Sequence, residues 1–252
     1  MIDVSHLSYV IADHQILNDI TTQLPRNQIT ALIGPNGAGK STLLGAIARQ
    51  LTPSVGEVRI GGENLTQIDP QVLAKRMAIV AQQLHVGSRI RVADLVGFGR
   101  WPHSQGRLSA ADNAAISDAL KRFDLTALHH RFLDELSGGQ RQRAFLAMAY
   151  TQDTDWLLLD EPLNNLDLKH ARSLMAHLRQ MVDHGGKSVV VVLHDLNFTL
   201  AWADHVVAMR AGQVVFSGPT TEVATSIALS DLYQTEIEVT SLNDRRFALY
   251  HR

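Results

Sequence analysis

The 252-residue sequence has no cysteine, which excludes disulfides, thiolate metal sites and cysteine nucleophiles. It also lacks a long apolar run: the longest, residues 144–150, covers seven positions, whereas a membrane-spanning helix needs roughly 20. No basic stretch followed by an apolar one stands near Met1, so we expect no signal peptide. These absences predict a soluble, cytosolic chain that reaches a membrane only by docking to another protein.

The sequence also has no excess of charge of one sign. Lys and Arg number 23 against 25 Asp and Glu, which gives a net charge of −2. A protein built to bind nucleic acid needs a surplus of Lys and Arg, so we expect no nucleic-acid partner. The hydrophobic fraction of 45% is ordinary, and the chain is long enough to bury a sizeable core.

The apolar runs predict the fold class. Residues 29–33, 156–159 and 189–193 have the character of buried strands, and a helical apolar stripe lies within 174–182. Buried strands that alternate with amphipathic helices predict an α/β fold with a mainly parallel sheet, covered on both faces. We further expect short strands within residues 2–33, and a helical insertion at about 88–150, with a helix at 110–122, inside a single domain of residues 1–252.

A glycine-rich loop follows the strand predicted at 29–33 and precedes a helix predicted from about Lys40. Small residues in such a loop let backbone N–H groups converge on phosphates. Lys40 adds positive charge for the β- and γ-phosphates, and the Ser41 hydroxyl can bind Mg²⁺. A turn that merely caps a helix explains the ordered pattern less well. The loop matches the phosphate-binding P-loop at Gly34, Pro35, Asn36, Gly37, Ala38, Gly39, Lys40, Ser41 and Thr42.

Two adjacent carboxylates, Asp160 and Glu161, end the apolar run at 156–159. Acids at the end of a buried strand are costly unless they meet a cation or a proton. We expect Asp160 to hold Mg²⁺ through water, and Glu161 to accept a proton from an attacking water. The alternative is an exposed acidic turn before Pro162, which becomes less favourable once the chain also carries a P-loop.

The segment 136–143, Leu-Ser-Gly-Gly-Gln-Arg-Gln-Arg, resembles the signature motif of ATP-binding cassette (ABC) ATPases. Ser137 is a good N-cap for a helix, and the glycines after it expose backbone N–H groups. The resemblance covers essentially the whole chain. It implies a P-loop NTPase core, an N-terminal antiparallel β subdomain and a head-to-tail pair of copies. In that pair Ser137, Gly138, Gly139 and Gln140 of one copy contact the ATP held by the other.

The same resemblance assigns four further residues. His194 looks like the switch histidine at the γ-phosphate, and Gln82 like the Q-loop glutamine that senses Mg²⁺ and water, although Gln83 stands beside it. Asp167 looks like the D-loop aspartate at the dimer seam. Tyr9 is the aromatic expected to stack on adenine, and its alternative is an ordinary strand tyrosine in the core.

One departure from the family pattern precedes the P-loop strand. Asn27-Gln28 stands where the family usually has Gly-Glu or Gly-Gln. Asn tolerates a positive φ, so we expect the turn to be preserved.

Three segments resemble importers of ferric siderophores of the catecholate type: residues 97–107, 152–155 and 161–167. The resemblance implies an ATP-hydrolysing subunit at the cytoplasmic face of the inner membrane. It would drive a separate permease and, indirectly, serve a substrate-binding protein. The alternatives are an importer of haem or cobalamin, a cassette that regulates some non-membrane assembly, and a stand-alone P-loop enzyme such as a small-molecule kinase.

Overall fold

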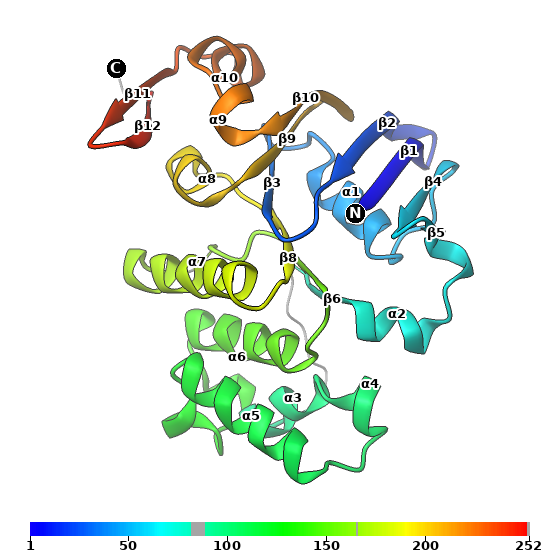
Figure 1. The fold of residues 1–252 in the computed structure, drawn as a ribbon, viewed down its shortest axis with the longest axis vertical. Helices are drawn as coiled ribbons and strands as arrows, with labels where there is room; N and C mark the ends of the chain where they lie inside the picture. The colour runs from blue at the N-terminus through cyan, green and yellow to red at the C-terminus, as the bar shows by residue number, and fades with distance from the viewer. Residues whose placement is uncertain (82–88, 165, 251–252) are drawn as a thin grey trace. The chain divides into compact units, whose positions relative to one another are not determined.

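The computed structural model describes residues 1–81, 89–164 and 166–250 (Figure 1). The chain divides into two compact units. The first unit comprises Met1–Ile68 and Met175–Arg252, and the second comprises Asp69–Leu174. The helical subdomain expected at about 88–150 falls within the second unit, and the single-domain organisation stays a prediction. No helix in the described part of the chain is long and apolar enough to cross a membrane.

The first unit contains the four-stranded antiparallel sheet near the N-terminus, strands β3, β8, β9 and β10, and the C-terminal elements. Its strands are β1 (Ile2–Ile11), β2 (His14–Leu24), β3 (Ile29–Ile33), β4 (Val55–Ile60), β5 (Glu63–Asn64), β8 (Ser188–Val192), β9 (His205–Arg210), β10 (Gln213–Pro219), β11 (Glu238–Leu242) and β12 (Arg245–Leu249). Its helices are α1 (Lys40–Ile47), the 3-10 turn η1 (Leu65–Gln67), α8 (Leu196–Trp202), α9 (Thr220–Val223) and α10 (Ser226–Tyr233).

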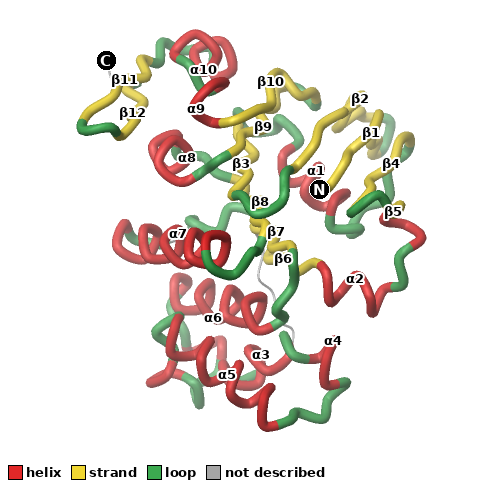
Figure 2. The backbone as a smooth tube through the Cα atoms, in the orientation of Figure 1, coloured by secondary structure: helices red, strands yellow, loops and turns green. Residues whose placement is uncertain are grey.

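The second unit is mainly helical, as the red segments of Figure 2 show. Its elements are α2 (Pro70–Arg76), β6 (Met77–Val80), α3 (Val92–Phe98), α4 (Trp101–Ser104), α5 (Ala110–Arg122), the 3-10 turns η2 (Thr126–Leu128) and η3 (Leu133–Glu135), α6 (Gly138–Thr151) and β7 (Trp156–Leu159). Helix α7 (Leu168–Asp183) contains the boundary between the units. The helix expected at 110–122 is confirmed as α5, whose start is fixed by a capping box of Ser109 with Asp112.

Parallel pairing dominates the α/β part, as expected. In the first unit β3 pairs in parallel with β8 on one side and β9 on the other, and β10 joins β9 antiparallel. In the second unit β6 and β7 pair in parallel. Every residue of β3 and β8 is buried, which explains why their sequences are mostly apolar and do not alternate.

The expected antiparallel β subdomain is formed by β2, β1, β4 and β5 in that order. The expectation of short strands was wrong here, since β1 has 10 residues and β2 has 11. The β1–β2 register shifts between Val4 and Leu7 and again between Leu7 and Tyr9. Such irregularities bend and twist a strand without ending it, so polar residues inside the run do not mark its end.

The turn before β3 forms as predicted. Asn27 adopts a positive φ of 56°, which an asparagine tolerates at low cost. Its backbone N–H donates to the Ser188 hydroxyl at 2.9 Å, and Val189 N–H donates to the carbonyl of Gln28 at 2.9 Å. The turn is therefore joined to the start of β8, and the loss of the family glycine leaves it intact.

Candidate functional site

The phosphate loop and His194 emerge from neighbouring strands of the first unit. Gly34 follows β3 directly, and His194 follows β8 by two residues. The strands are parallel and in register, with Leu32 opposite Val192, and Leu193 N–H donates to the Leu32 carbonyl at 3.2 Å. Because the carboxyl ends of adjacent parallel strands meet at one edge, the structure brings these two predicted site segments together.

Lys40 is the buried cation of the loop. Its side chain is only about one-twentieth exposed, and its ammonium donates to the carbonyls of Gly34 at 2.8 Å and Pro35 at 3.0 Å. Burying an ammonium is costly unless such acceptors surround it. The contacts hold a full positive charge inside the loop, next to the first turn of α1, where Ser41 is exposed. This combination suits the phosphates of a nucleotide.

The loop has its shape because several of its positions admit only glycine. Gly34 has φ of 140°, and a Cβ there would lie 2.0 Å from the Met209 carbonyl oxygen of β9. Gly39 has φ of 95°, and a Cβ there would lie 2.8 Å from the side chain of Leu17. The turn after β9 also holds the loop, since Gly212 N–H donates to the Ala38 carbonyl at 3.1 Å. The remaining loop residues, including the exposed Asn36 and Gly37, extend between these fixed points.

Tyr9 lies in β1 and is half-buried, so it is neither a core residue nor fully exposed. Its register partner in β2 is Leu17, the residue that stands against Gly39 of the loop. The strand pair thus places Tyr9 one strand away from the end of the phosphate loop. Its stacking on adenine stays a prediction, as do the roles of the other site residues.

In the second unit, the acid pair follows β7. Asp160 is nine-tenths buried, and its backbone N–H donates to the Val80 carbonyl at the end of β6, at 2.9 Å. Glu161 takes the left-handed conformation with φ of 50°, which is rare for a residue with a side chain. The side-chain amide of Asn164 donates to its Oε2 at 2.5 Å. The turn therefore fixes one carboxylate oxygen of Glu161.

The signature segment begins α6 through a capping box. Gln140 N–H donates to the Ser137 hydroxyl at 3.3 Å, and Ser137 N–H donates to the Gln140 side-chain oxygen at 3.0 Å. Ser137 and Gly138 are exposed. Further along the helix, the buried Gln142 amide donates to the Pro162 carbonyl at 3.1 Å. The signature helix is thus bonded to the residue after Glu161, a link that the sequence motifs do not reveal.

Asp167 precedes α7 and binds the first turn of that helix. Its carboxylate accepts from the backbone N–H of His170 at 2.8 Å and contacts the His170 ring at 2.7 Å. The backbone hydrogen bond, followed by the ring contact, lowers the pKa of Asp167. Gln82, and Gln83 beside it, lie outside the described residues. In the described ranges, no group of three or more His, Asp and Glu side chains could hold a metal ion.

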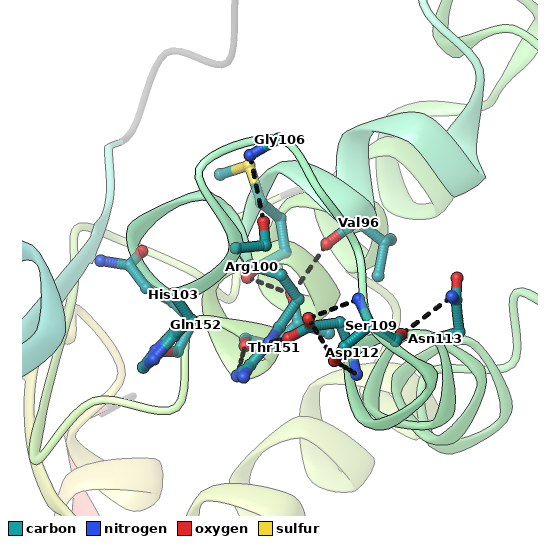
Figure 3. Close-up of polar contacts among 11 residues, drawn as sticks. Val96, Arg100, His103, Gly106, Ser109, Asp112, Asn113, Thr151 and Gln152 are labelled. Carbon is teal, nitrogen blue, oxygen red and sulfur yellow. Dashed lines mark hydrogen bonds and ion pairs between the residues drawn. The ribbon is translucent and has the colours of Figure 1, made fainter.

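A polar cluster joins two of the three importer-like segments in the second unit (Figure 3). The Arg100 guanidinium contacts Asp112 at 2.7 Å and donates to the Thr151 carbonyl at 2.8 Å, while the His103 ring contacts the Gln152 carbonyl at 2.9 Å. Arg100 and Asp112 are both nearly enclosed. Segment 97–107 is therefore held against the end of α6, where segment 152–155 begins.

The cluster predicts a pH-dependent stability. The Ser109 hydroxyl, then the Ser109 backbone N–H and Arg100, lower the pKa of Asp112 below its ordinary value of 3.8. A carboxyl with a lowered folded-state pKa stabilises the fold above its ordinary pKa, and this stabilisation is lost as pH falls through the folded-state value. We expect the urea midpoint of the wild type to exceed that of Asp112→Asn from pH 7 down to about 4, and the gap to shrink at lower pH.

The matched control is Asp134→Asn, because Asp134 is exposed and its ion pair with the exposed Arg89 is long, at 3.6 Å. Exposed pairs contribute little, so this variant should follow the wild type closely over the whole range. A gap between wild type and Asp112→Asn that stays constant down to pH 3 would contradict the assignment.

Comparison with known proteins gives the family of this chain. Residues 17–164 match the ABC transporter family model. The petrobactin import ATP-binding protein of Bacillus subtilis (strain 168) is 40% identical over 250 residues, covering 99% of each chain. The ferric enterobactin transport ATP-binding protein of Escherichia coli (strain K12) is 36% identical over 222 residues, covering 87% of this chain and 82% of the other.

The fold agrees with a solved structure of the same class. An ABC transporter determined in an inward-facing conformation superposes with a TM-score of 0.82 and 25% identity, covering 99% of this chain and 95% of that one. The ordered motifs, the architecture of both units and the full-length relatives thus agree with one another. The chain belongs to the ABC transporter family, as an ATP-binding, ATP-hydrolysing cassette.

Proposed function

We propose that this chain supplies the energy for uptake of a ferric siderophore through a separate membrane permease. One observation carries the proposal: the match to an import ATP-binding protein extends over 99% of both chains. It therefore includes segments 97–107 and 152–155, which the Arg100 and His103 contacts hold together. Because segment 97–107 would face the permease, the siderophore would not contact this chain, and we infer that the permease and a substrate-binding protein recognise it.

The working form is a head-to-tail pair of copies at the cytoplasmic face of the membrane. Ser137 and Gly138 are exposed at the capped start of α6, where backbone N–H groups favour an anion. The described turn around Ser137 contains no lysine. It therefore suits the γ-phosphate of an ATP whose other contacts come from the second copy. Asp167, exposed at the start of α7, would lie at the seam between the copies.

The residues present fit ATP with Mg²⁺. The buried ammonium of Lys40 and the open space around Gly37 suit the phosphates, while the Ser41 hydroxyl and the Asp160 carboxylate are hard oxygen donors of the kind Mg²⁺ prefers. The resemblance to the family assigns Gln82 to the same metal. Magnesium bound there would neutralise charge that develops on the phosphates during hydrolysis.

The protein side chains have separate roles in ATP binding and hydrolysis. Glu161, fixed by Asn164, accepts the proton of the attacking water. Lys40 and the partner's Ser137 stabilise negative charge on the γ-phosphate, and His194 together with Gln82 orients that phosphate and the water. Tyr9 stacks on the adenine ring.

Uptake of labelled ferric siderophore tests the proposal. Cells that lack the gene are complemented with wild type, Lys40→Ala or the control Lys121→Ala, which removes an exposed lysine of α5. Loss of a charged hydrogen-bond donor should weaken ATP binding roughly 10- to 100-fold, so Lys40→Ala should leave uptake at the level of the deletion. Normal iron uptake in the deletion strain, with impaired uptake of haem or cobalamin instead, would contradict the siderophore assignment but not the ATPase.

A further inference from the structure

The C-terminal segment of the first unit contacts the phosphate loop, although it lies outside every nucleotide motif. The hydroxyl of Tyr233, the last residue of α10, accepts a hydrogen bond from Gly34 N–H at 3.1 Å across 199 positions of sequence. Burial raises the pKa of Tyr233 to about 12, so the hydroxyl stays neutral at physiological pH. Leu229 and Leu232 of α10 are fully buried and anchor the helix that carries it.

Gly34 is a position where such a contact has consequences. Its φ of 140° is left-handed, and its backbone lies close to the Met209 carbonyl. Few other groups can therefore reach its N–H. Lys40 binds the carbonyl of the same residue, so both ends of Gly34 are held, the carbonyl by the ammonium and the N–H by the phenol. A buried backbone N–H without a partner is costly, so losing the phenol would allow Gly34 to rotate and the loop to open.

Two further contacts join α10 and the strands after it to the rest of the first unit. Arg210, at the end of β9, donates to the Asp231 carbonyl of α10 at 2.5 Å, immediately before the turn that binds Ala38. In β12, the backbone N–H of Ala248 donates to the side chain of Asn197 at 2.8 Å, in the helix that follows His194. The segment 226–249 is therefore joined both to the phosphate loop and to the helix after His194.

We propose that Tyr233 is a positioning residue for ATP binding: through Gly34 it holds the phosphate loop in the conformation that accepts nucleotide. The inference rests on the assigned role of the loop. A loop that is correctly shaped only part of the time binds with an affinity reduced by that fraction. Bound ATP selects the correct shape, so turnover at saturating ATP is preserved.

The test compares Tyr233→Phe with wild type and with Tyr150→Phe, which removes a tyrosine hydroxyl bound to Asp118 at 3.0 Å in the second unit. Affinity is measured by competition of ATP against trinitrophenyl-ATP fluorescence, and turnover by phosphate release. For Tyr233→Phe we expect the Kd and KM for ATP to rise roughly five- to tenfold, with kcat within twofold of wild type. Tyr150→Phe should bind ATP as the wild type does.

A structural role alone would lower Tm in both variants and leave both affinities unchanged, which would overturn the inference. A fall in kcat at constant KM in Tyr233→Phe would also overturn it. The result separates this inference from the function of the cassette. Failure of the wild type to bind ATP would contradict both the proposed function and the role of Tyr233. Equal ATP binding by all three proteins would contradict only the role of Tyr233.

Discussion

Replacing Glu161 by glutamine is expected to slow ATP turnover by about 10²–10⁴, because a positioned general base contributes that much to a proton-transfer step. The amide keeps the size of the carboxylate but cannot take the proton of the attacking water. Its oxygen can still accept the Asn164 amide, which holds Oε2 of the glutamate at 2.5 Å. The left-handed turn at φ of 50° is unaffected by the exchange, so the side chain should keep its position.

ATP binding by Glu161→Gln should stay close to wild type, since the phosphate loop is unaltered. Unable to hydrolyse the nucleotide, the variant should accumulate as an ATP-bound dimer, visible by size-exclusion chromatography with ATP and absent with ADP. Phosphate release gives the rate. Glu222→Gln removes an exposed carboxylate from α9 and should hydrolyse ATP normally. Near wild-type turnover in Glu161→Gln would take Glu161 out of the role of base.

Much of the site could be predicted because its signals are local. The phosphate loop, the acid pair after β7 and the cap at Ser137 each consist of fewer than ten consecutive residues. In the structure each adjoins the helix or strand that was expected. The fold class follows from the same logic, since β3 and β8 are buried along their whole length. The preserved turn at Asn27 could be predicted from the tolerance of asparagine for positive φ.

What could not be predicted depends on residues far apart in sequence. Tyr233 binds Gly34 across 199 positions, and Arg100 reaches the Thr151 carbonyl across 51. A backbone partner has no side-chain identity to recognise in a sequence, so neither contact could be predicted. The length of β1 and β2 was missed for a related reason: register shifts disturb the alternation on which strand prediction depends.

Introducing a carboxylate at Ser137 is the second change with a large expected effect. If two copies close head to tail, the substituted side chain meets the γ-phosphate of the ATP held by the other copy. Two like charges about 4 Å apart near a protein surface repel strongly enough to change a rate by roughly 10²–10³. We therefore expect Ser137→Asp to lose hydrolysis by about that factor. The protein should keep its affinity for ATP, because the phosphate loop of the same chain is unchanged.

Because of the capping box, the effect of a charge at residue 137 on hydrolysis can be measured separately from any effect on folding. The Ser137 hydroxyl accepts from Gln140 N–H, and Asp and Asn are N-caps as good as Ser, so both substitutions should preserve the start of α6 and the Tm. Ser137→Asn is then the matched control, with the shape of aspartate and no charge. Hydrolysis by Ser137→Asn should exceed that of Ser137→Asp by roughly two orders of magnitude, measured at saturating ATP and at protein concentrations that favour pairing. Equal rates for the two variants would mean that no phosphate approaches this helix, and the head-to-tail pair would have to be abandoned.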